Sequence, residues 1–217
     1  MTEASPGEEA LRGRQAEARR NDTAIGEAAL AVLSADPGAP MSAVARAAGV
    51  GQGTLYRRYP DKQALLIDVC ERGLAAIAEA AHAALDSPES GPALGRFLEW
   101  YAESGTLRMT ALLGTFDPPE HLHTLGHQAN EDMQQLVARA AAAGAIRADV
   151  TGADLTMIAT QLGTLNAPDP ERARQLRRRY LTLIWQGLSI TDASPLPGPA
   201  PHADELEAPW QDEPRPS

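Results

Sequence analysis

Apolar residues recur along most of the chain at the three- and four-residue spacing of an amphipathic helix. No segment shows the sustained alternation of apolar and polar residues that a half-buried strand requires. Ala, Leu and Arg are abundant, and these residues favour helix, whereas aromatic residues make up only 4%. The pattern therefore predicts an all-α fold.

Capping and turn signals divide this pattern into about nine helices. In the first third of the chain, helices are expected to begin at Asp22 or Thr23, near Ser42, near Gln52 and at Lys62. Later helices are expected over residues 93–104, 107–115 and 120–143, from Thr151, and after Pro170.

Both ends of the chain lack an apolar stripe. Residues 1–18 are small and charged, and residues 191–217 are rich in Pro, Asp and Glu, so we expect both segments to be disordered. Between them, the expected fourth helix joins a small N-terminal domain, residues 19–65, to a larger helical domain, residues 66–190.

Charge is distributed unevenly along the chain. The net charge of -10 argues against a nucleic-acid-binding surface over the whole protein. Residues 19–62, however, hold six Arg and Lys against four Asp and Glu, so the acidic excess lies elsewhere. This distribution suits a protein that binds DNA at one end.

Cys70 is the only cysteine, which excludes an intrachain disulfide. The first twenty residues contain no apolar signal segment, and no apolar run reaches the roughly 18 residues that a membrane span requires. We therefore expect a cytoplasmic protein with no membrane partner.

Residues 41–66, MSAVARAAGVGQGTLYRRYPDKQALL, hold the most specific pattern. Val44 and Ala45 give one short helix a small apolar face. Gly49 suits the left-handed backbone conformation that often ends such a helix, and Leu55 is expected to point inward from the next helix. These features predict a helix-turn-helix. The side chains left facing outward are Gln52, Thr54, Tyr56, Arg57 and Arg58.

This segment resembles the DNA-binding domain of the tetracycline-repressor (TetR) family over about residues 20–70. The resemblance rests on the Ala-Gly-Val turn at residues 48–50, the Gly-Thr-Leu-Tyr run at residues 53–56, the aromatic Tyr59, and the helix opening at Lys62. It implies a dimeric transcriptional regulator with a helical ligand-binding domain. Gly51 departs from the family, which often has Ser or Thr there, and Tyr59 replaces the commoner Phe.

The resemblance also implies roles for individual residues. Gln52, Gly53 and Tyr56 would face base edges and nearby backbone, with Arg57 as a further reader. Gln pairs well with adenine and Arg with guanine in the major groove, whereas hydroxyl and ammonium groups suit phosphate oxygens. The expected phosphate contacts are Ser42, Thr54, Arg58 and Lys62, the only lysine in the chain.

The larger domain contains apolar residues that could line an effector cavity or form ordinary core. They are Phe97, Trp100, Tyr101, Met109, Phe116, Met133 and Met157. The apolar faces of the last two helices, about residues 151–189, predict a homodimer. We therefore expect a repressor that a small molecule releases from double-stranded operator DNA. The alternative is a constitutive binder or activator without a ligand.

A metal-dependent helical enzyme is the third alternative. His121, His123 and His127 lie close together, and His123 and His127 share a helical face. Solvated histidines at a helix start are the preferred interpretation, because no catalytic set with distinctive spacing accompanies them. We accordingly expect no catalytic activity, no cofactor and no metal.

Overall fold

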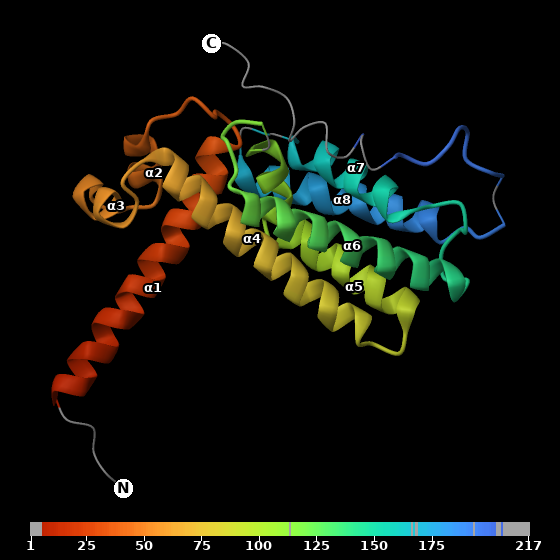
Figure 1. Cartoon of the computed structure of the whole chain (residues 1–217), viewed down its shortest axis with the longest axis horizontal. Helices are drawn as coiled ribbons and strands as arrows, with labels where there is room; N and C mark the ends of the chain where they lie inside the picture. The colour runs from red at the N-terminus through yellow and green to blue at the C-terminus, as the bar shows by residue number, and fades with distance from the viewer. Residues whose placement is uncertain are drawn as a thin grey trace, which may run out of the picture. The chain divides into compact units, whose positions relative to one another are not determined.

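The computed structural model describes residues 6–112, 114–165, 167, 169–192, 194–202 and 205, and only the backbone of residues 6–16, 18 and 19. Every regular element in these ranges is helical, so the all-α prediction is confirmed (Figure 1). The elements are α1 Pro6–Leu33, α2 Met41–Ala47, α3 Gln52–Arg58, α4 Lys62–Leu85, α5 Ser90–Glu103, the 3-10 helix η1 Thr106–Leu112, α6 Glu120–Ala142, α7 Gly152–Gly163 and α8 Pro170–Leu188.

The chain divides into two compact units, Met1–Leu65 and Leu66–Ser217. The first unit contains α1, α2, α3 and the first residues of α4, and the second contains the rest of α4 and all later helices. The helix α4 is therefore the element that belongs to both units.

The first helix begins earlier than the sequence suggested. We expected a start at Asp22 or Thr23 after a disordered arm over residues 1–18, but α1 begins at Pro6. Pro is favoured at the first helical position, and the following Glu, Ala, Leu, Arg and Gln residues have high helix propensity, so no signal stops the helix upstream of Asp22. Residues 1–5 of the predicted arm lie outside the described residues.

The core of the first unit is built from small and branched residues of all its helices. Ile25 and Leu33 of α1 are 1% exposed, and Val44 of α2 and Leu55 of α3 are fully buried. Tyr59, directly after α3, is 2% exposed. These apolar residues hold α3 against α1 and α2, which leaves the opposite side of α3 in solvent.

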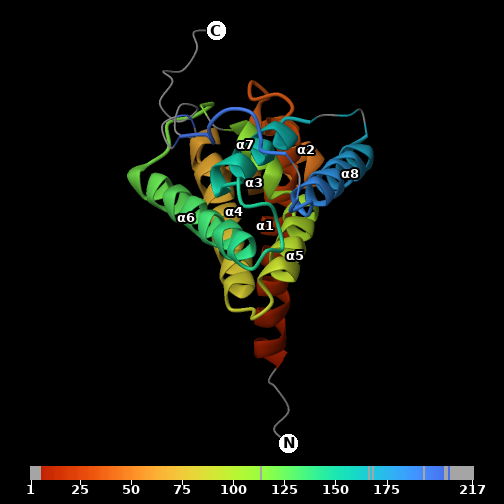
Figure 2. The same ribbon diagram turned by 90° about the vertical axis from the view of Figure 1, so that its right-hand side faces the viewer.

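Small residues allow close helix contacts in the second unit. The helices α5 and α8 lie side by side, as do α6 and α7 (Figure 2). Gly163, the last residue of α7, lies against the carbonyl group of Leu107 and the side chain of Thr110, both from η1. A side chain at residue 163 would occupy the same space, so the glycine permits this packing.

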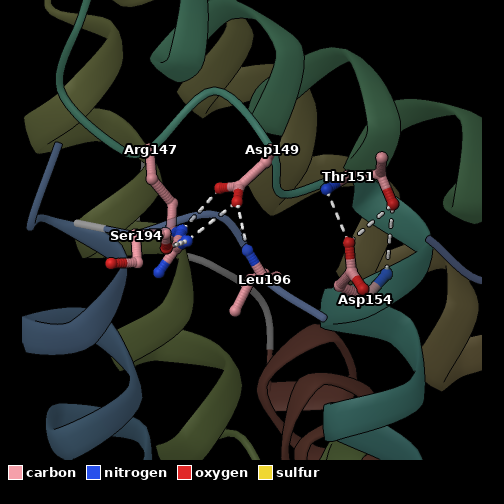
Figure 3. Close-up of polar contacts among 6 residues, drawn as sticks. All are labelled: Arg147, Asp149, Thr151, Asp154, Ser194 and Leu196. Carbon is pink, nitrogen blue, oxygen red and sulfur yellow. Dashed lines mark hydrogen bonds and ion pairs between the residues drawn. The ribbon is translucent and has the colours of Figure 1, made fainter. Parts of the chain in front are cut away.

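The connection between α6 and α7 has two well-defined ends. Gly144, with φ +67, ends α6, and the Ala145 amide donates to the Ala140 carbonyl oxygen, as in a Schellman motif. Thr151 begins α7 through a capping box with Asp154, which confirms the predicted cap (Figure 3).

Part of the C-terminal segment is bound to this connection. The Arg147 guanidinium donates to both Asp149 carboxylate oxygens and to the Ser194 carbonyl oxygen, and the Leu196 amide donates to Asp149 (Figure 3). We expected disorder from residue 191 onward, but these backbone groups find charged partners. Residues 193, 203, 204 and 206–217 of that segment lie outside the described residues.

Candidate nucleic-acid interface and effector region

The turn between α2 and α3 fixes the direction of α3. Gly49 has φ +68, a left-handed conformation that costs a glycine little. The Val50 amide donates to the Ala45 carbonyl oxygen and the Gly49 amide to that of Arg46, which completes a Schellman motif. Together with the buried Leu55, this turn sets α3 as the second helix of a helix-turn-helix.

The eight predicted DNA contacts lie on one unit, and none of them is buried. Gln52, Gly53, Tyr56, Arg57 and Arg58 are exposed, with 49% of the Tyr56 surface open to solvent. Half-buried positions are occupied by Ser42, Thr54 and Lys62. The side of α3 that faces away from the core thus combines amide, hydroxyl, phenol and guanidinium donors. Their contacts with DNA remain predictions.

Two arginines of α3 are held in place within the unit. The Arg58 guanidinium lies 3.4 Å from the Asp22 carboxylate of α1 and 5.0 Å from the ring centroid of Tyr59. The Arg57 guanidinium donates to the Thr54 hydroxyl over 3.2 Å. Sequence reasoning missed the role of Asp22, because it assigned this residue to a helix cap.

The start of α4 is tied to the loop between α1 and α2. Asp61 accepts a hydrogen bond from the Ala64 amide over 2.8 Å, which caps α4. The Lys62 ammonium donates to the Pro37 carbonyl oxygen over 2.8 Å. The fold therefore holds the Lys62 side chain in position.

Four of the predicted cavity residues lie on α5 and η1. Phe97, Trp100 and Tyr101 of α5 form a ring cluster with centroids 5.7 to 6.4 Å apart. Burial raises the pKa of Tyr101 to about 12. In η1, the Met109 sulfur packs directly against Gly73 of α4.

The other cavity candidates do not join this cluster into one described pocket. Met133 is buried and Phe116 is half-buried. Met157 is 37% exposed and lines an open groove on α7 and α8, which none of the other six candidates lines. The effector cavity therefore remains a prediction.

The histidine region forms a pairwise contact. The Nε2 atom of His121 lies 2.5 Å from a carboxylate oxygen of Glu71 on α4. No group of three or more His, Cys, Asp or Glu side chains in the described part of the chain is arranged to hold a metal ion.

Burial, with a further contribution from the Glu71 charge, raises the pKa of the Cys70 thiol to about 12, which disfavours the reactive thiolate.

Comparison with protein families gives two consecutive matches. Residues 25–69 match the model for bacterial regulatory proteins of the tetR family, and residues 89–190 match the C-terminal domain model described as transcriptional regulator SbtR-like. The chain belongs to the TetR family. It is a transcriptional regulator with an N-terminal helix-turn-helix DNA-binding domain and a helical C-terminal domain.

Solved structures of TetR-family regulators share this fold over nearly their whole length. SCO0520 from Streptomyces coelicolor is 26% identical, with 79% of this chain and 99% of that chain covered and a TM-score of 0.53. A TetR regulatory protein from Mycobacterium vanbaalenii is 29% identical, with coverage of 81% and 99% and a TM-score of 0.52. LfrR from Mycobacterium smegmatis, determined in complex with proflavine, is 22% identical, with coverage of 82% and 99% and a TM-score of 0.53. This similarity concerns the fold only.

No curated protein matches this TetR-family chain. Among the described residues, no helix has the length and apolar character needed to cross a membrane.

Proposed function

We propose that this TetR-family regulator is a repressor that binds operator DNA as a homodimer and is released by a small-molecule effector. The observation that supports operator binding is the exposed polar side of α3, which lies opposite the buried Leu55. A short helix with donors on its outer side and an apolar anchor on its inner side can enter the major groove without unfolding its domain.

Within this proposal, the eight residues of the DNA-binding unit have two kinds of role. Gln52, Gly53 and Tyr56 read base edges, with Arg57 as a further reader. Ser42, Thr54, Arg58 and Lys62 hold phosphates and set the register of the protein on the duplex. The ion pair between Arg58 and Asp22 supports a phosphate contact by Arg58, because a guanidinium that is already held in place loses less conformational freedom when it binds DNA.

The proposed partner in the dimer is a second copy of this chain, docked on the groove between α7 and α8. Three large apolar side chains there are exposed, Met157 by 37%, Tyr180 by 43% and Leu183 by 52%. An exposed apolar surface of this kind usually marks an interface, and homodimers bury the same patch of both copies. The lining residues are Met157, Ile158, Gln161, Leu162, Tyr180, Leu183 and Ile184.

Release by an effector follows if binding in the second unit favours a different position of α4. Because α4 contributes residues to both units, its position affects the spacing of the two α3 helices in a dimer. Two recognition helices bind adjacent major grooves only at one spacing. An effector that binds the protein more tightly when α4 is in the other position therefore lowers its affinity for operator DNA.

Selection of bound duplexes from a random DNA pool tests operator binding directly. We expect recovery of a two-fold symmetric sequence, which full-length protein binds far more tightly than a scrambled duplex. Equal affinity for both duplexes would contradict the proposal. Titration of the complex with a panel of small molecules then tests release, and an operator complex that no compound dissociates would favour the constitutive alternative.

A further inference from the structure

Arg177 of α8 is a buried cation. Only 6% of its surface is exposed, and arginines are rarely this buried unless a carboxylate or another anion accompanies them. Its Nη2 atom donates to the Leu165 carbonyl oxygen over 3.2 Å, whereas its Nε atom has no hydrogen-bond partner. No ion pair joins Arg177 to a carboxylate among the described residues.

The charge of a second guanidinium acts on Arg177. Burial first, and then the charge of Arg108 on η1, lower the pKa of Arg177. The Arg108 side chain crosses Gly105, where a Cβ atom would lie 3.3 Å from Nη2 of Arg108. Gly105 has φ +80, so both the space and the backbone conformation at this turn suit a glycine. The fold thus brings two like charges together inside the second unit.

The carboxylate of Glu103 pairs with an exposed arginine of α8. Glu103, at the end of α5, lies 3.3 Å from Arg178, and both side chains are more than half exposed. The carboxylate therefore pairs with the outward-facing arginine of α8, while its neighbour Arg177 points inward. The Leu165 carbonyl, just after α7, satisfies one of five guanidinium N–H groups and supplies a dipole but no full negative charge.

We infer that Arg177 forms a binding site for the oxyanion group of a small molecule. Carboxylate and phosphate share the required chemistry, because their oxygens accept the planar fork of N–H donors that a guanidinium presents. An anion would balance the buried charge of Arg177 and accept from its Nε atom. The inference deepens the proposed effector response and rests on it only for the consequence at the operator.

Thermal unfolding and calorimetry of the full-length protein test this site. Wild type, Arg177→Met and Arg178→Met are compared in sulfate, phosphate, acetate and octanoate against chloride at constant ionic strength. Sulfate and phosphate also stabilise proteins by general exclusion, so the informative quantity is the difference between variants in the same salt. Arg178→Met is the matched control, because it removes the adjacent, exposed charge.

We expect at least one oxyanion to raise the melting temperature of wild type and Arg178→Met, with saturable binding in calorimetry. Arg177→Met should lose about tenfold or more in affinity, since it removes a buried charge-assisted contact. Arg177→Lys should be intermediate, because it retains the charge without the fork. This variant also covers the case in which Arg177→Met fails to fold.

The salts distinguish the source of the anion. A response to sulfate or phosphate indicates a free inorganic anion, and a much stronger response to octanoate than to acetate indicates a carboxylate on an apolar body. Equal responses of wild type and Arg177→Met, or no saturable binding of any anion, would overturn the inference and leave Arg177 as a cap of α7. Operator titration in chloride alone separates this outcome from failure of the proposed function.

Discussion

The ammonium nitrogen of Lys62 lies 2.8 Å from the carbonyl oxygen of Pro37, so the first residue of α4 is bonded to the loop between α1 and α2. An ammonium group has three donors, and the Pro37 bond uses one of them. The remaining donors are held in a fixed position at the half-buried end of the helix. This arrangement suits a residue that binds a phosphate of the DNA backbone.

Lys62→Ala is expected to weaken operator and scrambled DNA by the same factor. A phosphate contact carries no sequence information, and its loss should lower the slope of log affinity against log salt by about one per monomer. Lys62→Arg, which retains the charge, is the control and should keep most of the slope. Fluorescence anisotropy at several salt concentrations provides the measurement, and an unchanged slope for Lys62→Ala would rule out the phosphate contact.

Gln52→Ala is expected to act on sequence recognition instead. If the amide reads a base edge, its removal should cost about 1–3 kcal/mol per half-site on the selected operator and much less on a site altered at the contacted base pair. The same titrations provide the data. Equal losses on every duplex would show that Gln52 does not read a base.

The helix-turn-helix was predictable because its signals are local. Gly49 and Leu55 lie within one short segment, and each residue type has a single good place there, the first at a left-handed helix end and the second in the core. The partner of Arg58 was not predictable in this way. Asp22 lies 36 residues away, and its bond to Arg58 depends on how α1 packs beside α3.

The burial of Arg177 in the second unit could not be predicted from the sequence either. Residues 172–179 contain five arginines and would be expected to lie on an exposed helical face, yet the packing of α8 buries Arg177. The expected helix over residues 107–115 is instead the 3-10 helix η1, which ends at Leu112. Such features arise from long-range contacts, which hydrophobic periodicity does not report.

Gly163→Ala is expected to destabilise the second unit by about 3 kcal/mol or more. The new Cβ atom would overlap the Leu107 carbonyl group and the Thr110 hydroxyl, and a backbone group has little freedom to move away. Gly53→Ala is the matched control, because no heavy atom lies within 4 Å of that Cβ position. Urea unfolding followed by circular dichroism should show a large loss for the first variant and little change for the second.

Asp149→Asn should make the stability of the protein less dependent on acid pH. Hydrogen bonds from Arg147 and then from the Leu196 amide hold the pKa of Asp149 below its ordinary value. A carboxyl group with a lowered folded-state pKa stabilises the fold above its unfolded-state pKa of about 3.9 and loses this contribution as the pH falls further.

The difference in melting temperature between wild type and Asp149→Asn should therefore be largest near about pH 7 and shrink toward about pH 3. Asp192→Asn is the control, since Asp192 is exposed and forms no ion pair among the described residues. A difference that stayed constant over this range would mean that the bonds to Arg147 and Leu196 do not contribute to folding stability.

Leu183→Glu is expected to convert the protein to a monomer. Leu183 is 52% exposed in the groove between α7 and α8, where the proposed second copy would cover it. A carboxylate there would be desolvated in both copies of a symmetric interface, which should raise the dimer dissociation constant by about a hundredfold or more. Leu125→Glu is the matched control, because Leu125 is 36% exposed on α6 and does not line the groove.

Light scattering should give about twice the 23.0 kDa chain mass for wild type and Leu125→Glu, and the mass of a single chain for Leu183→Glu. The monomer should also bind operator much more weakly, since one recognition helix contacts only one half-site. A dimeric Leu183→Glu protein would place the interface elsewhere on the second unit. A monomeric wild type at micromolar concentration would remove the dimer from the proposed mechanism, because the spacing of two α3 helices would then have no role in operator release.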